Sequence, residues 1–273
     1  MQKIQSVVVI LCAMAWYLLA VAPCVQAQAP SYDPIFVKIA PETLKKELRR
    51  NSKDAEELVK LIRRSIESKQ LETAFQALDQ LRREQPNNAA VLAAYVMVYD
   101  ASLYQVRKVS GTIRERKPQE KQIRDAASQK AKKLDPKLWL PYTIEGFPIV
   151  YQAIPSDKEY QQGLDLLKKA TLLAPSSFFA RKQFAAGLTV AAINKRKWNG
   201  KVVTYQQATA QYEIALKLEP KSADVTFALF SIYDIDLKDK DKATKAKRAF
   251  LQSLPPNYNI RKSIRQRLAK YPD

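Results

Sequence analysis

Residue types that support catalysis are scarce in this chain of 273 residues. It contains no histidine, which removes the commonest general base and the commonest metal ligand of proteins. Its five glycines are scattered, so no glycine-rich loop can surround a phosphate group. No serine stands in a Gly-x-Ser-x-Gly context, and the two cysteines, Cys12 and Cys24, both lie near the N-terminus. We therefore expect no catalytic residue, no cofactor and no metal site.

One run of acidic residues has a spacing like that of a calcium-binding loop. Asp234, Asp236, Asp239 and Asp241 follow one another in the segment YDIDLKDKDK. Calcium loops of this kind need a central glycine and a closing glutamate, whereas lysines alternate with the carboxylates here. We interpret the run as a solvated turn. Because carboxylates can also meet only in the folded chain, a cell-wall enzyme or its accessory subunit stays as a weaker alternative.

The first 27 residues have the composition of a secretory signal. Lys3 precedes an uncharged apolar run over residues 7–22, and the small-residue pattern Val25-Gln26-Ala27 follows. Cleavage after Ala27 removes both cysteines and leaves a mature chain without thiols. Because the apolar run approaches the ~17 residues of the shortest membrane spans, a retained N-terminal membrane anchor is the alternative. Both forms place the body outside the cytoplasm, in the periplasm or at the cell surface.

The chain is strongly basic. Lysine and arginine outnumber aspartate and glutamate by 46 to 27, which gives a formal net charge of +19. A charge of this size draws a protein to anionic surfaces such as phospholipid headgroups, acidic wall polymers and acidic proteins. Export disfavours nucleic acid as a partner.

An apolar helix end followed by proline recurs along the chain. The prolines stand at positions 86, 136, 175, 220 and 255, with spacings of 50, 39, 45 and 35 residues. Such spacings indicate a basic unit of about 34 residues that carries insertions. Alanine precedes three of these prolines by four or five residues, where two helices must approach closely. The pattern predicts helix pairs from residue 54 onward, after a linker and a leading helix within 28–53.

These features resemble the tetratricopeptide (TPR) repeat family, in which a unit of two antiparallel helices ends in such a proline. The fourth unit matches best, with Ala208, Tyr212, Ala215 and Pro220 on the pattern, whereas Arg124 replaces a small residue in the second. The resemblance implies an all-α, TPR-like helix-pair solenoid of about five helix pairs over 54–256. A basic C-terminal capping helix within 257–273 would close it. The alternative is that these prolines simply end helices, as in any all-α protein.

The resemblance implies a binding scaffold. In this family the first helices of successive units line a concave groove that receives an extended peptide or a helix. The groove positions carried across to this chain are Met97, Phe147, Tyr151, Phe179, Lys182 and Phe227. Their aromatic rings either anchor a partner or pack against neighbouring helices. We expect a non-catalytic scaffold of the bacterial cell envelope that recognises a protein or peptide partner.

Two basic insertions between the helices of a pair suggest a different site. They supply Arg114, Arg116 and Lys117 in the second unit and Lys195, Arg196, Lys197 and Trp198 in the fourth. In a helix-pair solenoid all such turns emerge along one edge, which the lysines of the fifth unit would extend. This basic edge would bind an anionic polymer or a membrane surface, with Trp198 at the headgroup interface. Otherwise the insertions are solvated loops without a partner.

The signal interpretation predicts a processed protein. We expect the exported mature chain to begin at Gln28, because the charged start, the apolar run and the small-residue pattern occur in the order that signal peptidases require. Intact-mass measurement on protein from the native host should give the mass of residues 28–273. A mass that includes residues 1–27 contradicts cleavage and favours the anchor.

Overall fold

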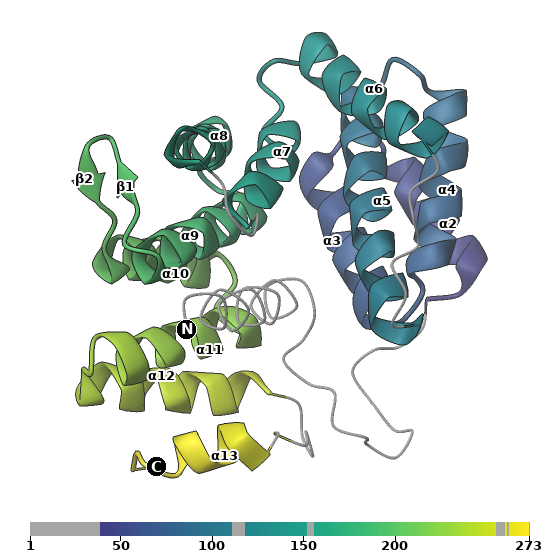
Figure 1. Cartoon of the computed structure of the whole chain (residues 1–273). Coiled ribbons are helices and arrows are strands. Elements are labelled where there is room, and N and C mark those ends of the chain that lie inside the picture. Colours follow the sequence, from purple (N-terminus) through teal and green to yellow (C-terminus); the bar gives the residue numbers. More distant parts are fainter. Residues whose placement is uncertain (1–38, 111–117, 152–155, 255–259, 261, 273) are drawn as a thin grey trace. The chain divides into compact units, whose positions relative to one another are not determined.

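The computed structural model describes residues 39–110, 118–151, 156–254, 260 and 262–272. Within these ranges the chain forms twelve α-helices, one short π-helix and one two-stranded hairpin (Figure 1). The predicted all-α class is therefore confirmed. No described helix combines the length and the apolar character that crossing a membrane requires. Residues 1–27 lie outside the described ranges, so the signal peptide stays a prediction.

The helices belong to two compact units. The N-terminal unit, Phe36–Glu145, contains α2 (Pro41–Arg50), α3 (Ala55–Glu67), α4 (Leu71–Glu84), α5 (Ala89–Ser110), α6 (Pro118–Leu134) and the start of α7 (Leu140–Val150). The C-terminal unit includes Gly146–Asp273. It contains the end of α7, α8 (Asp157–Leu173), α9 (Phe178–Ile193), β1 (Lys197–Trp198), β2 (Lys201–Val202), α10 (Tyr205–Leu218), α11 (Ala223–Ser231), the π-helix η1 (Ile232–Asp236), α12 (Lys240–Ser253) and α13 (Lys262–Leu268).

In the N-terminal unit, helices that follow one another in the chain pack together. Helix α4 contacts both α3 and α5, and α5 packs against α6. The leading helix α2 begins at Pro41 and buries Leu44 and Leu48 completely. The Arg49 guanidinium of α2 donates hydrogen bonds to both oxygens of the Glu84 carboxylate at the end of α4, at 2.7 and 2.9 Å. The leading helix is thus joined to the first helix pair by an apolar face and by one bidentate ion pair.

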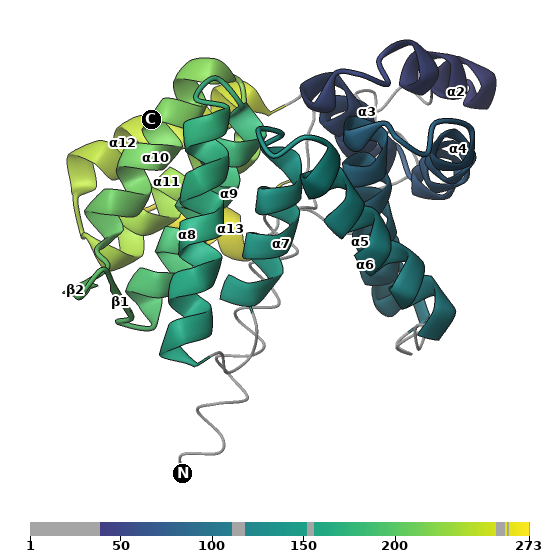
Figure 2. The same ribbon diagram turned by 90° about the horizontal axis from the view of Figure 1, so that it is seen from above.

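The C-terminal unit is also built from consecutive helices. Helix α9 packs mainly against α10, and α11 packs mainly against α12 (Figure 2). Helix α13 buries Ile264 and Leu268. Its Arg267 forms an ion pair with Asp234 at 3.0 Å.

Four of the predicted proline turns have the same hydrogen bonds. In turns 85–88, 135–138, 174–177 and 219–222, the N–H of the residue before proline donates to the carbonyl four residues earlier, at 2.7–3.0 Å. The N–H of the fourth turn residue then donates back to the carbonyl of the first, at 3.0–3.2 Å. The residue before proline lies outside the helical region, with φ of −124° at Gln85, −134° at Ala174 and −128° at Glu219 and ψ between 62° and 85°. Proline disfavours helical backbone in the preceding residue, so each helix ends at the same place in its unit. The fifth proline lies outside the described ranges.

Buried small residues lie on the second helices of three pairs. Ala131, Ala170 and Ala215, five residues before their prolines, are completely buried. Helices α7 and α8 approach closely, because a Cβ on Gly146 would lie only 2.7 Å from the carbonyl oxygen of Gly163. Such a distance leaves no room for a side chain at either crossing residue.

The second helix pair also contains a half-buried ion pair. Arg124 of α6 stands where the other pairs carry a small residue, and its guanidinium donates to both carboxylate oxygens of Asp100 on α5, at 2.7 and 3.3 Å. Burial alone lowers the pKa of Arg124, but the hydrogen bond and charge of Asp100 outweigh it and raise the pKa overall. The predicted long insertion also differs, since α5 extends to Ser110 and α6 begins at Pro118. Much of the insertion predicted between these two helices therefore extends the helices themselves.

The close crossing of α7 and α8 generates a stability prediction. Replacing Gly146 with alanine should lower the free energy of unfolding by about 1–3 kcal/mol, because the new Cβ clashes with the backbone of α8. The better helix propensity of alanine offsets at most about 1 kcal/mol of that loss. Urea unfolding followed by circular dichroism measures the difference.

Gly187→Ala is the matched control. There the new Cβ would meet Cδ1 of Leu167 at 2.8 Å, which is the movable end of a side chain. Its loss should be smaller than that of Gly146→Ala. Equal stability of the Gly146 variant and the parent protein would contradict the close crossing.

Candidate functional site

The insertion between α9 and α10 folds as a β-hairpin. Lys197 pairs with Val202 and Trp198 pairs with Lys201 across two antiparallel strands. The turn residues Asn199 and Gly200 have φ of 52° and 76°. Positive φ at both central residues is the geometry of the tight hairpin turn that favours Asn-Gly. The basic insertion is therefore an ordered element.

Trp198 fixes this hairpin to the body of the C-terminal unit. Its indole Nε1–H donates to Asp165 of α8 at 2.8 Å, and its ring packs edge-on against Phe184 of α9 with centroids 5.6 Å apart. The Lys168 ammonium lies 5.1 Å from the centroid of the same ring. Trp198 was predicted to face a membrane interface, but these contacts direct its ring toward α8 and α9.

Arg196 makes a second attachment at the start of the hairpin. Its guanidinium forms an ion pair with Asp157 at the N-terminus of α8, at 2.5 Å, and lies 5.7 Å from the ring centroid of Tyr160. The carbonyl of Arg196 accepts a hydrogen bond from the N–H of Val203 at 2.9 Å, which closes the base of the hairpin. Arg196 is therefore already paired with a carboxylate of the same protein.

The turn after α11 carries the acidic run and begins with the π-helix η1. The Leu237 N–H donates to the Ile232 carbonyl at 2.9 Å, which is the i to i+5 bond of a π-helix. Asp234 accepts hydrogen bonds from Arg267 at 3.0 Å and from the Tyr271 hydroxyl at 2.6 Å. Only 10% of its side chain is exposed. The interpretation of this run as a solvated turn is therefore wrong for Asp234, whose carboxylate holds the C-terminal segment against η1.

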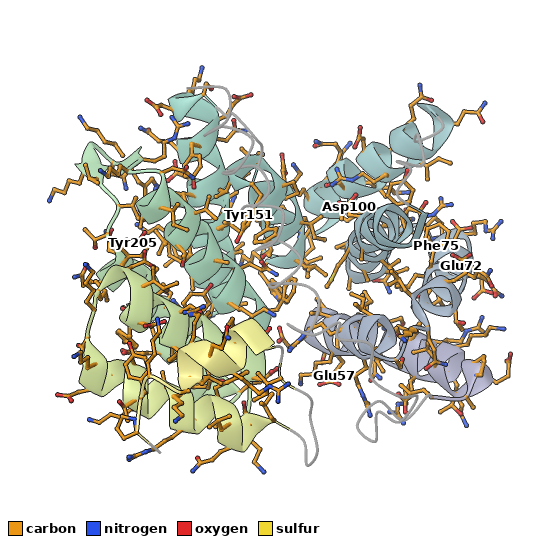
Figure 3. All side chains as sticks on the ribbon, turned by 60° about the horizontal axis from the view of Figure 1, so that its bottom comes forward. Glu57, Glu72, Phe75, Asp100, Tyr151 and Tyr205 are labelled. Carbon is orange, nitrogen blue, oxygen red and sulfur yellow. The ribbon has the colours of Figure 1, made fainter. Side chains whose placement is uncertain are left out.

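The hairpin and the turn after η1 lie along the same edge of the C-terminal unit (Figures 1 and 2). Figure 3 labels Tyr205, the first residue of α10 after the hairpin. The Tyr205 side chain forms a hydrogen bond with Asp236 of η1. Burial and this bond raise the pKa of the Tyr205 hydroxyl. Burial also raises the pKa of Asp236, against the opposing effects of Tyr205 and Arg267. The bond ties the two turns together.

Exposed lysines gather on this edge. We define the lysine edge as Lys195, Lys197 and Lys201 of the hairpin with Lys238 and Lys240 of the turn. All five are exposed and form no ion pair within the described part of the chain. Among the nearby carboxylates, Asp236 bonds Tyr205, Asp239 caps α12 and contacts Lys242 at 3.7 Å, and Asp241 is exposed. The edge therefore presents a net positive charge. The other predicted members, Arg114, Arg116 and Lys117, lie outside the described residues.

The residues predicted to line a peptide groove are mostly buried. Phe147, Phe179 and Phe227 are between 5% and 8% exposed. Phe147 stacks against Tyr151 with ring centroids 4.2 Å apart, and burial raises the pKa of the Tyr151 hydroxyl. Phe227 packs against Phe250 of α12 at 5.1 Å and lies beneath Arg267 of α13 at 5.8 Å. Met97 is half-buried on α5 of the N-terminal unit. These contacts agree with the alternative in which the aromatic rings pack against neighbouring helices.

Lys182 has a structural partner within the same unit. Its ammonium forms an ion pair with Asp224 of α11 at 2.5 Å, and only 6% of the side chain is exposed. The Asp224 carboxylate also accepts hydrogen bonds from the Ser222 hydroxyl and from the Val225 N–H, the latter at 2.9 Å. Moving a buried cation away from its carboxylate toward another partner costs free energy. Lys182 therefore links α9 to α11.

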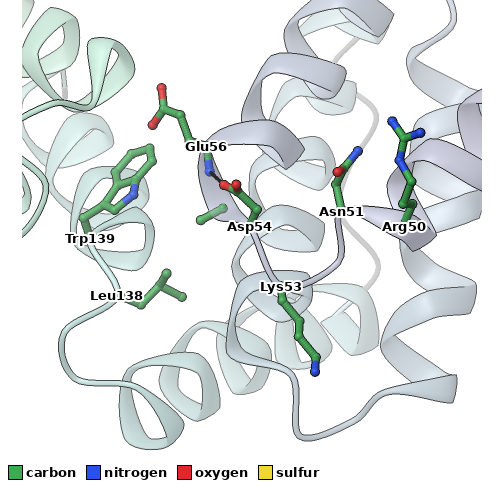
Figure 4. A pocket seen from close by; sticks show the side chains of 8 residues that line it. Arg50, Asn51, Lys53, Asp54, Glu56, Leu138 and Trp139 are labelled. Carbon is green, nitrogen blue, oxygen red and sulfur yellow. Dashed lines mark hydrogen bonds between the residues drawn. The ribbon is translucent and has the colours of Figure 1, made fainter.

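A pocket of about 410 Å³ lies in the N-terminal unit, between the start of α3 and the start of α7. Figure 4 shows Arg50, Lys53 and Glu56 around an opening that Trp139 borders. The Asp54 carboxylate already caps α3, because it accepts from the N–H groups of Glu56 and Glu57 at 3.0 and 3.1 Å. Charges of both signs line the pocket, so its lining does not favour an anionic ligand over a cationic one.

Comparisons with known proteins leave the chain without an assigned relative. No protein-family model matches it, and no curated protein matches it. The tetratricopeptide resemblance therefore rests on the residues of the sequence alone. Within the described residues, no group of three or more acidic, cysteine or histidine side chains could hold a metal ion.

Sequence reasoning missed the hairpin and its attachments. The dipeptide Asn199-Gly200 between two short runs with β-branched or aromatic residues is the signal that could have predicted it. The partners of Trp198 and Arg196, in contrast, lie on α8, more than thirty residues earlier. Only the packing of α8 beside the hairpin brings them together.

The structural role of Lys182 can be tested directly. Lys182→Met should lower the free energy of unfolding by about 1–3 kcal/mol, because it leaves the half-buried Asp224 carboxylate without its cation. Adding Asp224→Asn should recover part of this loss. Lys158→Met, at an exposed lysine of α8, is the control and should be close to neutral. Thermal and urea unfolding of the parent protein and the three variants measure these effects. Unchanged stability of Lys182→Met would contradict the structural role and favour the predicted groove position of this lysine.

Proposed function

We propose that the chain is a non-catalytic, TPR-like binding protein of the bacterial cell envelope whose contact surface is the lysine edge. In this proposal the five helix pairs, α3 with α4 through α11 with α12, stack as one solenoid. Four proline turns with equal hydrogen bonds and three buried alanines at equal positions support it. The partner is an anionic macromolecule or surface.

The observation that carries the proposal is the contrast between two sets of side chains. The groove rings are buried against their own unit, and Lys182 is paired with Asp224. The lysines of the edge extend into solvent without an ion pair to any described residue. A partner can therefore reach these lysines without breaking an interaction of the protein.

The edge is also held in place before any partner binds. The hairpin is joined to α8 through Trp198 and Arg196, and its base is joined to η1 through the bond between Tyr205 and Asp236. Binding then costs little ordering of the backbone, which favours affinity. Each lysine contributes on the order of 1 kcal/mol near an anionic membrane, and the attraction falls off over about 8 Å at physiological salt.

Charge reversal tests the proposed surface. Changing Lys195, Lys197, Lys201 and Lys238 together to glutamate should weaken binding to an anionic probe at least tenfold, because four attractive contacts become repulsive. Soluble polyglutamate and phosphatidylglycerol-containing vesicles are the probes, each measured at low and at physiological salt.

The control reverses the same number of exposed lysines elsewhere. Lys133, Lys137, Lys217 and Lys221 lie at or beside the proline turns and form no ion pair within the described part of the chain. Their replacement by glutamate changes the net charge equally but leaves the lysine edge intact. Equal losses in both variants would show that only net charge matters and would overturn the proposed surface.

A further inference from the structure

Aliphatic side chains stand exposed among the lysines of this edge. Ile193 at the end of α9 is 43% exposed, Val202 of β2 is 51% exposed and Ile235 of η1 is 54% exposed. Exposed aliphatic residues are ordinary when they are scattered singly. Here three of them share one edge with five unpaired lysines.

The hairpin register determines which residues face outward. Residues paired directly across two antiparallel strands place their side chains on the same face. Trp198 and Lys201 form one such pair, and the Trp198 ring faces α8 and α9. Lys197 and Val202 form the other pair, so their side chains lie on the opposite face, away from the body. The outer face of the hairpin thus combines a cation with an aliphatic group.

The π-helix produces a similar combination in the neighbouring turn. Asp234 and Asp236, on either side of Ile235, bond to α13 and to Tyr205 respectively. With both neighbours held in this way, the Ile235 side chain is the one that extends into solvent. Lys238 and Lys240 follow it on the same turn. Each of the two turns therefore presents an aliphatic group beside lysines.

We propose that the lysine edge docks on an anionic lipid bilayer, with Val202 and Ile235 inserted among the headgroups and the lysines bound to lipid phosphates. This inference rests on the proposed function and specifies its partner. A soluble polyanion satisfies the lysines but provides no apolar phase for the two aliphatic side chains. A bilayer interface satisfies both, because attachment there combines buried apolar area with attraction to anionic headgroups.

The decisive variant removes the aliphatic groups and leaves every charge in place. Val202→Thr combined with Ile235→Ser should weaken binding to vesicles of phosphatidylcholine and phosphatidylglycerol about tenfold, the loss expected when two aliphatic side chains no longer insert partway. Binding to soluble polyglutamate should not change. Vesicle flotation with the purified, processed protein measures the first affinity, and fluorescence anisotropy of labelled polyglutamate measures the second.

Leu172→Ser is the matched control. Leu172 is 70% exposed near the C-terminal end of α8, whereas Arg196 of the hairpin bonds Asp157 at its N-terminal end. This substitution removes an aliphatic group that is more exposed than Val202 or Ile235 and lies away from the lysine edge. It should leave vesicle binding unchanged, and circular dichroism confirms that all variants are folded.

A spectroscopic measurement locates the inserted residue. A processed chain has no cysteine, so Val202→Cys gives a single site for an environment-sensitive dye. The dye emission should shift to the blue with anionic vesicles and stay constant with polyglutamate.

The outcomes separate this inference from the proposed function. Unchanged vesicle binding by the Val202 and Ile235 variant, together with loss in the lysine-to-glutamate variant, overturns the bilayer and leaves an anionic polymer or acidic protein as partner. Failure of the parent protein to bind vesicles has the same meaning if polyglutamate still binds. If the lysine-to-glutamate variant binds both probes as the parent does, the proposed function fails as well.

Discussion

The close approach of paired helices at alanine and glycine is the constraint on which the rest of this structure depends. At the crossing of α7 and α8 a Cβ atom on Gly146 would lie 2.7 Å from a backbone oxygen, and three alanines at equal places before proline turns are completely buried. Close helices bury larger apolar neighbours such as Leu164 and Leu167 without exposure. The proline turns then end the second helix of a pair at the same point, so successive helix pairs repeat one geometry.

This constraint also explains where the chain can carry additional residues. The proline turns have a fixed hydrogen-bond pattern, whereas the turns between the two helices of a pair vary in length and structure. One of them became a hairpin and another a π-helical turn. Both are attached to the helices by a few polar contacts from Trp198, Arg196 and Asp236. A regular body with variable turns on one edge is the arrangement in which function most often resides in loops.

The sequence predicted the helices well because their signals are local. The residue before each proline, the buried alanines and the apolar periodicity act within one turn of helix. The site was harder to predict because its contacts connect distant residues. Asp234 was interpreted as solvated since its partner, Arg267, lies thirty-three residues later. Lys182 was placed in a groove since nothing nearby in the sequence identifies Asp224 of the next pair as its partner. Arg124 departs from the repeat for the same reason, because Asp100 stabilises it from another helix.

The positions of the indole rings give each unit its own optical reporter. Of the three tryptophans, Trp16 lies in the predicted signal segment, Trp139 is 7% exposed in the N-terminal unit, and Trp198 is half-buried in the C-terminal unit. Trp198 contacts a carboxylate and an ammonium group, whereas Trp139 lies at the start of α7 beside the pocket. Because the emission of an indole depends on its surroundings, the fluorescence of the processed protein is a sum of two local signals. Replacing one ring with phenylalanine would therefore make the folding of a single unit visible within the intact chain.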